Sequence, residues 1–153
     1  VVFKRSLLQL TDTYLEIQRA LAEDNFKIAK EKSQIFNRQL NQVDMSMLVG
    51  NVHDQWMKLE KEIKKSIKSF ANVSNINDAR TQFAPLSDQL TNLIKEFEID
   101  ARKDIYLIHC PMALDNKGAF WLQDSVEVKN PYFGSSMLKC HDSKEIIRTK
   151  QKK

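Results

Sequence analysis

The side chains that could bind a metal ion are concentrated in the last third of the chain. They fall in two short clusters, His109-Cys110-Pro111-Met112 and Met137-Leu138-Lys139-Cys140-His141. Both cysteines, two of the three histidines and two of the five methionines of the chain lie in these clusters. Thiolate, thioether and imidazole groups are soft or borderline ligands, which favour Cu(I), Ag(I) or Zn(II) over Mg²⁺ or Ca²⁺. The sequence therefore predicts a soft-metal site if folding brings the two clusters together.

Each of these side chains also has a purely structural interpretation. Cys110 and Cys140 are compatible with a disulfide, with a metal site or with inert buried thiols. A disulfide is common in exported proteins and would leave no thiolate for a metal ion. The two methionines of the clusters could fill gaps in a small core, and the two histidines could lie in solvent. The metal-site hypothesis depends on six such donors falling in two tight clusters.

A weaker group of the same residue types occurs earlier in the chain, between the second and third predicted helices. It consists of Met45, Met47, His53 and Met57. These residues would add ligands only if this connection packed against the C-terminal segment. Packing or solvation explains them equally well.

Several other chemistries lack the residues that they need. The second cluster resembles a c-type haem attachment motif, but Met137 replaces the first cysteine of C-x-x-C-H. The chain has no C-x-x-C pair, P-loop, dinucleotide fingerprint or G-x-S-x-G motif. Cys110 and His141 could form a Cys–His nucleophile, but no oxyanion-stabilising element accompanies them. We therefore expect a binding protein rather than an enzyme.

Composition and charge further limit the classes of protein to which this chain can belong. The 153 residues, of which 29% are charged, are enough for a single domain with a sizeable core. No apolar run approaches the ~20 residues of a transmembrane helix, and no leader peptide is visible. The net charge of +4 is concentrated in a basic tail over 142–153. Nucleic-acid binding is not expected, because basic residues do not cluster with aromatic ones.

The region 4–99 is predicted to be a helical bundle. It contains one glycine and one proline, whereas the other two glycines and two prolines follow Asp100. Apolar residues recur at alternating steps of three and four in four stretches, which places each set on one helix face. The stripes are Leu7, Leu10, Tyr14, Ile17 and Leu21; Phe26, Ala29, Phe36, Leu40 and Val43; Val49, Val52, Trp56, Leu59, Ile63 and Phe70; and Ile76, Ala79, Phe83, Leu86, Leu90, Leu93 and Phe97. Asp24 is the predicted N-cap of the second helix, and Ser74, Asn75 and Asn77 are candidate caps of the fourth. Short connections favour an antiparallel up-down-up-down four-helix bundle.

The segment 103–141 has the pattern of a small β-hairpin followed by a loop. Two apolar runs, 105–108 and 119–122, flank the polar turn 115–118, which ends in glycine. The alternating stretch 126–128 is a candidate third strand. A returning loop after it would carry Cys140 back toward Cys110. The prediction is a mainly α domain with a C-terminal hairpin and loop appendage.

Several short motifs resemble a bacterial family designated domain of unknown function 3347. They are Ala79-Arg80-x-x-Phe83-x-x-Leu86-Ser87, Cys110-Pro111-Met112-Ala113, Gly118-Ala119-Phe120-Trp121-Leu122, Asn130-Pro131-Tyr132-Phe133-Gly134 and Met137-Leu138-x-Cys140. Members of that family are mostly exported proteins, which occur alone or fused to the periplasmic adaptor subunits of copper and silver efflux pumps.

The resemblance implies that this chain handles a heavy metal outside the cytoplasm. By position, it implies Cys110, Met112, Met137 and Cys140 as ligands of Cu(I) or Ag(I), with His109 and His141 as additional candidates and Zn(II) as a weaker choice of ion. An efflux adaptor or pump is the implied partner. The alternative is an interaction module stapled by a Cys110–Cys140 disulfide, with no metal. The oligomeric state is left open.

Overall fold

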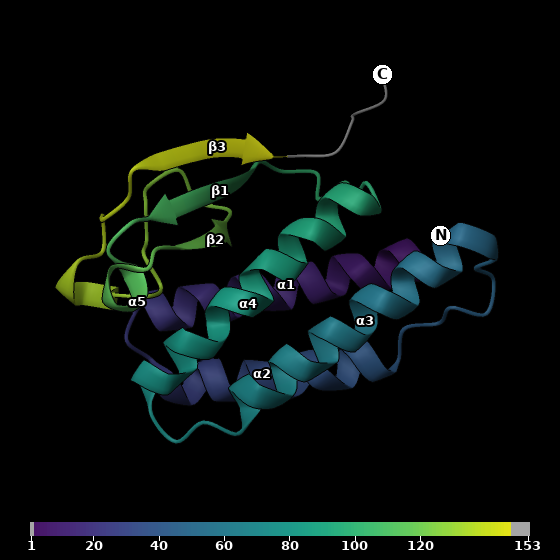
Figure 1. Ribbon diagram of the computed structural model, residues 1–153, viewed down its shortest axis with the longest axis horizontal. Helices are drawn as coiled ribbons and strands as arrows, with labels where there is room; N and C mark the ends of the chain where they lie inside the picture. Colours follow the sequence, from purple (N-terminus) through teal and green to yellow (C-terminus); the bar gives the residue numbers. More distant parts are fainter. Residues whose placement is uncertain (1, 148–153) are drawn as a thin grey trace.

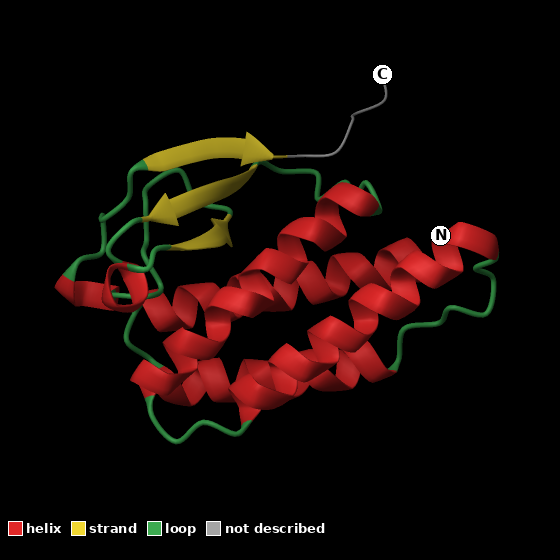
Figure 2. Ribbon diagram, viewed as in Figure 1, coloured by secondary structure: helices red, strands yellow, loops and turns green. Residues whose placement is uncertain are grey.

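The computed structural model describes residues 2–147, and most of them are helical (Figures 1 and 2). The four long helices are α1 (Val2–Ala22), α2 (Phe26–Asn41), α3 (Gly50–Ala71) and α4 (Ile76–Glu96). Each stripe predicted from the sequence falls in or beside one of them. The expectation of a mainly helical chain with a small β-appendage is confirmed.

Each long helix packs against two others. α1 contacts α2 and α4, and α3 contacts the same two helices. The core between them contains the stripe residues, with Tyr14, Phe36, Trp56 and Phe83 fully buried. Val49 and Val52, however, are 79% and 44% exposed, so the first part of the third stripe is wrong as a core prediction. Val49 precedes α3, and Val52 lines an open space between the start of α3, the start of α1 and the end of α4, which leaves part of its side chain in solvent.

Local hydrogen bonds explain where two of the helices begin. The side chain of Asn75 accepts the backbone N–H of Asp78 at 2.9 Å, so Asn75 is the cap of α4 among the three predicted candidates. The predicted cap of α2 is wrong by one residue, because Asn25 accepts the N–H of Ile28 at 3.1 Å. Asp24 adopts a left-handed backbone conformation with φ 59° and bonds to Arg80 instead.

Three antiparallel strands form a small sheet in the order β2-β1-β3. β1 (Ile105–Cys110) and β2 (Ala119–Gln123) make the predicted hairpin, with Cys110 opposite Ala119. The single turn α5 (Ala113–Asn116) connects them, and a 3₁₀ turn, η1 (Gly134–Ser136), lies in the later loop. Because β1 pairs with a neighbouring strand along each of its edges, its backbone N–H and C=O groups are hydrogen-bonded although its side chains are mostly apolar.

The third strand comes from a different segment than the sequence predicts. Residues 126–128 form no strand, whereas β3 (Ser143–Ile147) pairs with β1 and places Ser143 opposite His109. β3 lies inside the segment predicted to be a basic tail, and the rest of that tail, 148–153, is outside the described residues. The ammonium group of Lys144 lies 4.9 Å from the centre of the Tyr106 ring. Two interactions therefore favour a strand in the polar segment of β3. One is the backbone pairing with the second edge of β1, and the other is this cation–π contact.

One face of the sheet lies against the helices. α1 and α4 contact β2, and the backbone N–H of Leu122 donates to the hydroxyl of Tyr14 at 3.1 Å. Leu107 and Phe120 border the same small cavity as Asp88 and Thr91 of α4. The opposite face is covered by the loop over 124–142. Within residues 2–147, no helix combines the length and the apolar content needed to span a membrane.

Candidate functional site

The two cysteines, 30 residues apart in the chain, meet in the structure. Their sulfur atoms are 3.0 Å apart, and both thiols are free. A covalent disulfide needs about 2.05 Å, and two thiolates sharing one ion at about 2.3 Å each lie farther apart than 3.0 Å. The observed contact is that of a hydrogen-bonded thiol pair, which stands geometrically between the two states expected from the sequence.

Strand geometry decides where Cys110 points. It is the last residue of β1 and is fully buried. Successive side chains of a strand point to opposite faces of the sheet. Cys110 therefore points to the face that the loop covers, and its neighbour His109 points to the other face.

Asn130 holds the loop in the position that brings Cys140 to Cys110. Its side-chain N–H donates to the carbonyl oxygen of Cys140 at 2.9 Å. Its side-chain oxygen accepts the backbone N–H groups of Tyr132 and Phe133. Its own backbone N–H donates to Leu138 at 2.8 Å. Because Asn130 is fully buried, its hydrogen bonds are shielded from water and fix the loop beside Cys140.

Gln123, the last residue of β2, fixes the first half of the same loop. Its amide nitrogen donates to the carbonyl oxygens of Ser125 and Glu127. Its amide oxygen accepts the backbone N–H of Lys129 and the indole N–H of Trp121, each at 3.0 Å. Every hydrogen-bonding position of this buried amide is directed at the loop or the sheet, so the loop has a specified conformation.

Arg80 joins the loop to the helices. Its guanidinium donates to the carbonyl oxygens of Pro131 at 2.8 Å and Leu21 at 2.7 Å, and to a carboxylate oxygen of Asp24 at 2.8 Å. The other oxygen of Asp24 accepts the N–H of Ser135. Hydrogen bonds from Ser135 and Arg80 lower the pKa of Asp24. We call these three residues, Asp24, Arg80 and Ser135, the arginine clamp.

Gly134 lies inside this clamp and has no room for a side chain. A Cβ atom at this position would collide with the Asp24 carboxylate and the Arg80 guanidinium. Its φ of +58° also lies in the left-handed region that glycine adopts most readily. The close approach of the loop to the clamp therefore requires glycine here.

The two methionines of the clusters approach Cys140 through their main chains. The backbone N–H of Met112 faces the sulfur of Cys140, and the carbonyl oxygen of Met137 accepts the N–H of Cys140 at 3.2 Å. The Met112 side chain is 46% exposed, and that of Met137 is half-buried. The structure thus brings the sulfur of Cys110 and the main chains of Met112 and Met137 to Cys140.

The two histidines of the clusters are held by other partners. His109 Nδ1 donates to the carboxylate of Asp142 at 2.8 Å, and its ring lies 4.5 Å from that of Phe120, on the face opposite Cys110. His141 Nδ1 donates to the carbonyl oxygen of Lys139 at 2.8 Å, because a carbonyl can only accept. The free nitrogen of His141 is consequently Nε2.

The earlier group of methionines and His53 is not near the cysteines. The connection between α2 and α3 lies at the opposite end of the molecule from the loop that carries Cys140 (Figure 1). Met47 is 88% exposed there. The structure therefore does not bring Met45, Met47, His53 and Met57 to the two clusters.

The thiol of Cys140 is protonated at neutral pH. The hydrogen bond to Cys110, with a smaller effect of burial, raises the pKa of Cys140 to about 11. Within residues 2–147, no group of three or more His, Cys, Asp and Glu side chains converges as a metal site. An ion bound here would have to displace a thiol proton and use sulfur as its principal ligand.

The residues that build this site were only partly visible in the sequence. Cys110, Met112, Met137 and Cys140 were named for their chemistry. Gln123, Asn130, Arg80 and Asp24 were not singled out as positioning residues. The signal for Arg80 was a charged residue on the apolar face of α4, four residues after Ile76 and three before Phe83, where it is only 8% exposed.

Comparison with known proteins identifies a family. No curated protein and no solved structure matches the chain. The family model described as "Protein of unknown function (DUF3347)" matches residues 10–102, which include α2, α3, α4 and most of α1 and exclude both cysteines. Because this match covers more than half of the chain, the protein belongs to the DUF3347 family.

Proposed function

We propose that the protein binds one Cu(I) or Ag(I) ion through the sulfur atoms of Cys110 and Cys140, and captures that ion or hands it over to another protein. The observation that carries the proposal is the 3.0 Å contact between two free thiols that are 30 residues apart in the chain. Two thiolates are sufficient ligands for a soft monovalent ion and disfavour hard cations.

Binding would require a small separation of the two sulfurs and the loss of thiol protons. Because Cys110 belongs to a hydrogen-bonded strand, its position is constrained. Cys140, which is half-buried in the loop, would therefore be the residue that moves to separate the two sulfurs. The thioethers of Met112 and Met137, whose main chains touch Cys140, are the proposed third and fourth ligands. His141 could add its free Nε2 nitrogen, whereas the bond of His109 to Asp142 makes it the weakest of the six candidates.

The proposed setting is outside the cytoplasm, in association with metal efflux. The resemblance of the chain to exported proteins fused with efflux adaptors supports this setting. We further propose that the four long helices form an antiparallel up-down-up-down bundle, since each packs against two others. The outer faces of such a bundle would offer a surface for an adaptor or pump.

Anaerobic titration of the reduced protein with Cu(I), in competition with a colorimetric chelator, tests the metal site. We expect one ion per chain and a loss of affinity of at least 100-fold in the Cys110→Ser/Cys140→Ser double variant. Met112→Leu and Met137→Leu should each weaken binding by about tenfold, because a weak ligand is lost without a change in volume. Equal affinity of the wild-type protein and the double variant would contradict the proposal.

A second candidate function is a disulfide-stapled interaction module, which the same sulfur contact favours. Closing a loop of 30 residues would stabilise the fold by about 3.5 kcal/mol in the chain-entropy model. Mass spectrometry of the protein purified without reductant distinguishes the candidates. Complete loss of two protons with no bound metal indicates the disulfide, and intact thiols with one equivalent of metal indicate the ion site.

A further inference from the structure

A second candidate site lies at the opposite end of the molecule from the cysteines. A pocket of about 570 Å³ is bordered by the start of α1, the connection between α2 and α3, the start of α3 and the end of α4. This volume falls in the range typical of small-molecule sites and corresponds to roughly twenty water molecules. The pocket shares no residue with the thiol pair or with the arginine clamp.

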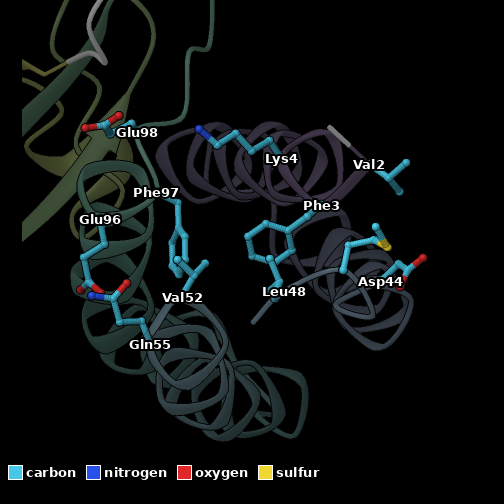
Figure 3. Close-up of a pocket in the computed structure, with 11 residues that line it drawn as sticks. Val2, Phe3, Lys4, Asp44, Leu48, Val52, Gln55, Glu96, Phe97 and Glu98 are labelled. Atoms are coloured by element: carbon cyan, nitrogen blue, oxygen red, sulfur yellow. The ribbon is translucent and has the colours of Figure 1, made fainter. Parts of the chain in front are cut away.

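The inner wall of the pocket is apolar and built from packed aromatic rings. Phe3, Phe97, Val52 and Leu48 point into the same space (Figure 3). Phe3 meets Phe97 edge to face at 5.5 Å, and Trp56 packs against Phe3 at 5.2 Å. Phe3 and Phe97 are almost fully buried, so this wall is formed before any ligand arrives.

At the mouth of the pocket, apolar side chains are exposed to solvent. Val52 is 44% exposed and Met47 is 88% exposed, and both line the pocket. Val52 belongs to the stripe that the sequence predicts as core. A stripe residue that lines an open pocket has apolar surface available for a ligand.

Acidic residues dominate the rim. Asp44, Glu96 and Glu98 line the pocket together with a single basic residue, Lys4, although the chain as a whole carries a net charge of +4. The hydrogen bond from Ser46 lowers the pKa of Asp44, so this carboxylate is ionised at neutral pH. Within residues 2–147, neither glutamate forms an ion pair with a basic side chain.

The carboxylates surround the apolar wall from different sides. Glu96 lies beside Gln55 on one side of the pocket, Asp44 lies on the opposite side, and Glu98 lies near Lys4 above them (Figure 3). A positive group at the mouth would be attracted by this rim, whereas an anionic headgroup would meet three carboxylates and one lysine.

We propose that this pocket binds a small amphiphilic organic cation, with its apolar body against Phe3, Phe97 and Val52 and its ammonium group at the acidic rim. The apolar wall determines the body of the ligand and the rim determines its charge. The pocket thereby distinguishes such a cation from neutral and anionic molecules of the same shape.

Three probes with the same apolar body, a phenyl ring on four methylene groups, test this assignment: 4-phenylbutylammonium, 4-phenylbutanol and 5-phenylpentanoate. Binding is followed by the amide chemical shifts of the ¹⁵N-labelled protein at low ionic strength. We expect saturable shifts at the pocket residues and an affinity order of ammonium, then alcohol, then carboxylate. The ammonium should bind about fivefold more tightly than the alcohol, given the modest energy of exposed charge pairs, and 0.5 M salt should reduce this preference.

Two sets of variants locate the binding. Val52→Trp should fill the pocket and abolish the shifts, whereas Met57→Trp, at another exposed position of α3 that does not line the pocket, should leave them unchanged. Glu96→Gln/Glu98→Gln should reduce the preference for ammonium over alcohol to less than twofold. Cys110→Ser/Cys140→Ser should have no effect, which separates this proposal from the metal site.

Three outcomes would overturn the proposal. The first is the absence of saturable shifts with the ammonium probe at millimolar concentration, which would leave the apolar surface to a protein partner. The second is an equal or higher affinity for the carboxylate probe. The third is binding that survives in a correctly folded Val52→Trp variant, as judged by circular dichroism.

Discussion

The two ends of the molecule use their polar groups in opposite ways. At the cysteine end, the side chains of Arg80, Gln123 and Asn130 are buried and make several hydrogen bonds each to the loop. At the pocket end, Glu96 and Glu98 remain exposed and Met47 presents its apolar side chain to solvent. The first end has one specified geometry, as a two-sulfur site needs. The second leaves surface and charge available to a ligand.

The largest effect should come from breaking the arginine clamp. Arg80→Ala removes the donor for two carbonyl oxygens and leaves the Asp24 carboxylate without its charged partner. Loss of buried hydrogen bonds of this kind should lower the free energy of unfolding by about 3 kcal/mol. Urea denaturation measures the change. The matched control is Arg38→Ala, an exposed arginine of α2, which should change stability by less than about 0.5 kcal/mol. Similar losses for both variants would contradict the clamp.

Replacing Asn130 should have the next largest effect. Asn130→Asp preserves the shape but places an acceptor against the carbonyl oxygen of Cys140, where the amide donates now. We expect a loss of about 2 kcal/mol in the free energy of unfolding, from one unsatisfied buried contact. Cu(I) affinity should fall as well, whereas binding of 4-phenylbutylammonium at the other end should be unchanged. A similar loss of affinity for Cu(I) and for 4-phenylbutylammonium would show that the two ends of the molecule are not independent.

The raised pKa of Cys140 predicts its chemical reactivity. With a pKa of about 11, the thiol is almost entirely protonated at pH 8 and should react slowly with iodoacetamide. Cys110→Ala removes the hydrogen bond that is the main cause and should lower the pKa. The rate at pH 8 should then rise by about tenfold, because the gain in thiolate outweighs the loss of intrinsic nucleophilicity.

The same pKa also predicts how stability depends on pH. The folded protein holds the Cys140 proton more tightly than the unfolded chain, whose thiol titrates near 9. The resulting stabilisation is present below pH 9 and is lost as the pH rises toward 11. Denaturation of the reduced protein across this range should show the loss in the wild type and a smaller one in Cys140→Ser. Identical pH profiles would contradict the thiol hydrogen bond.

The smallest effect should be found in the connection between α2 and α3. Met47→Ser and Val49→Ser alter side chains that are 88% and 79% exposed, so the free energy of unfolding should change by less than about 0.5 kcal/mol. The nearby Leu40→Ala, at a fully buried position of α2, should cost about 3 kcal/mol by comparison. A large loss in the two serine variants would mean that these side chains are covered in solution.

The prediction from sequence succeeded where a signal is local and periodic. The stripes of Leu, Ile and Phe located all four long helices, since apolar residues three or four apart share a helix face. The hairpin followed from two apolar runs and a turn ending in Gly118. The same reasoning missed β3, because a polar strand becomes visible only when its partner β1 is in place. It also counted Val49 and Val52 as core, because a helical pattern does not show how closely the neighbouring helices pack along its length.

By itself, the sequence determined the helices, the hairpin and the short list of sulfur and imidazole side chains available for chemistry. Only the tertiary structure decided that the sulfurs of Cys110 and Cys140 meet, that His109 points to the other face of the sheet, and that an open pocket lies at the far end. The reason is the range of the interactions. Periodicity operates over a few residues, whereas the position of Cys140 depends on bonds from Arg80, Gln123 and Asn130 to a loop whose course no local pattern specifies.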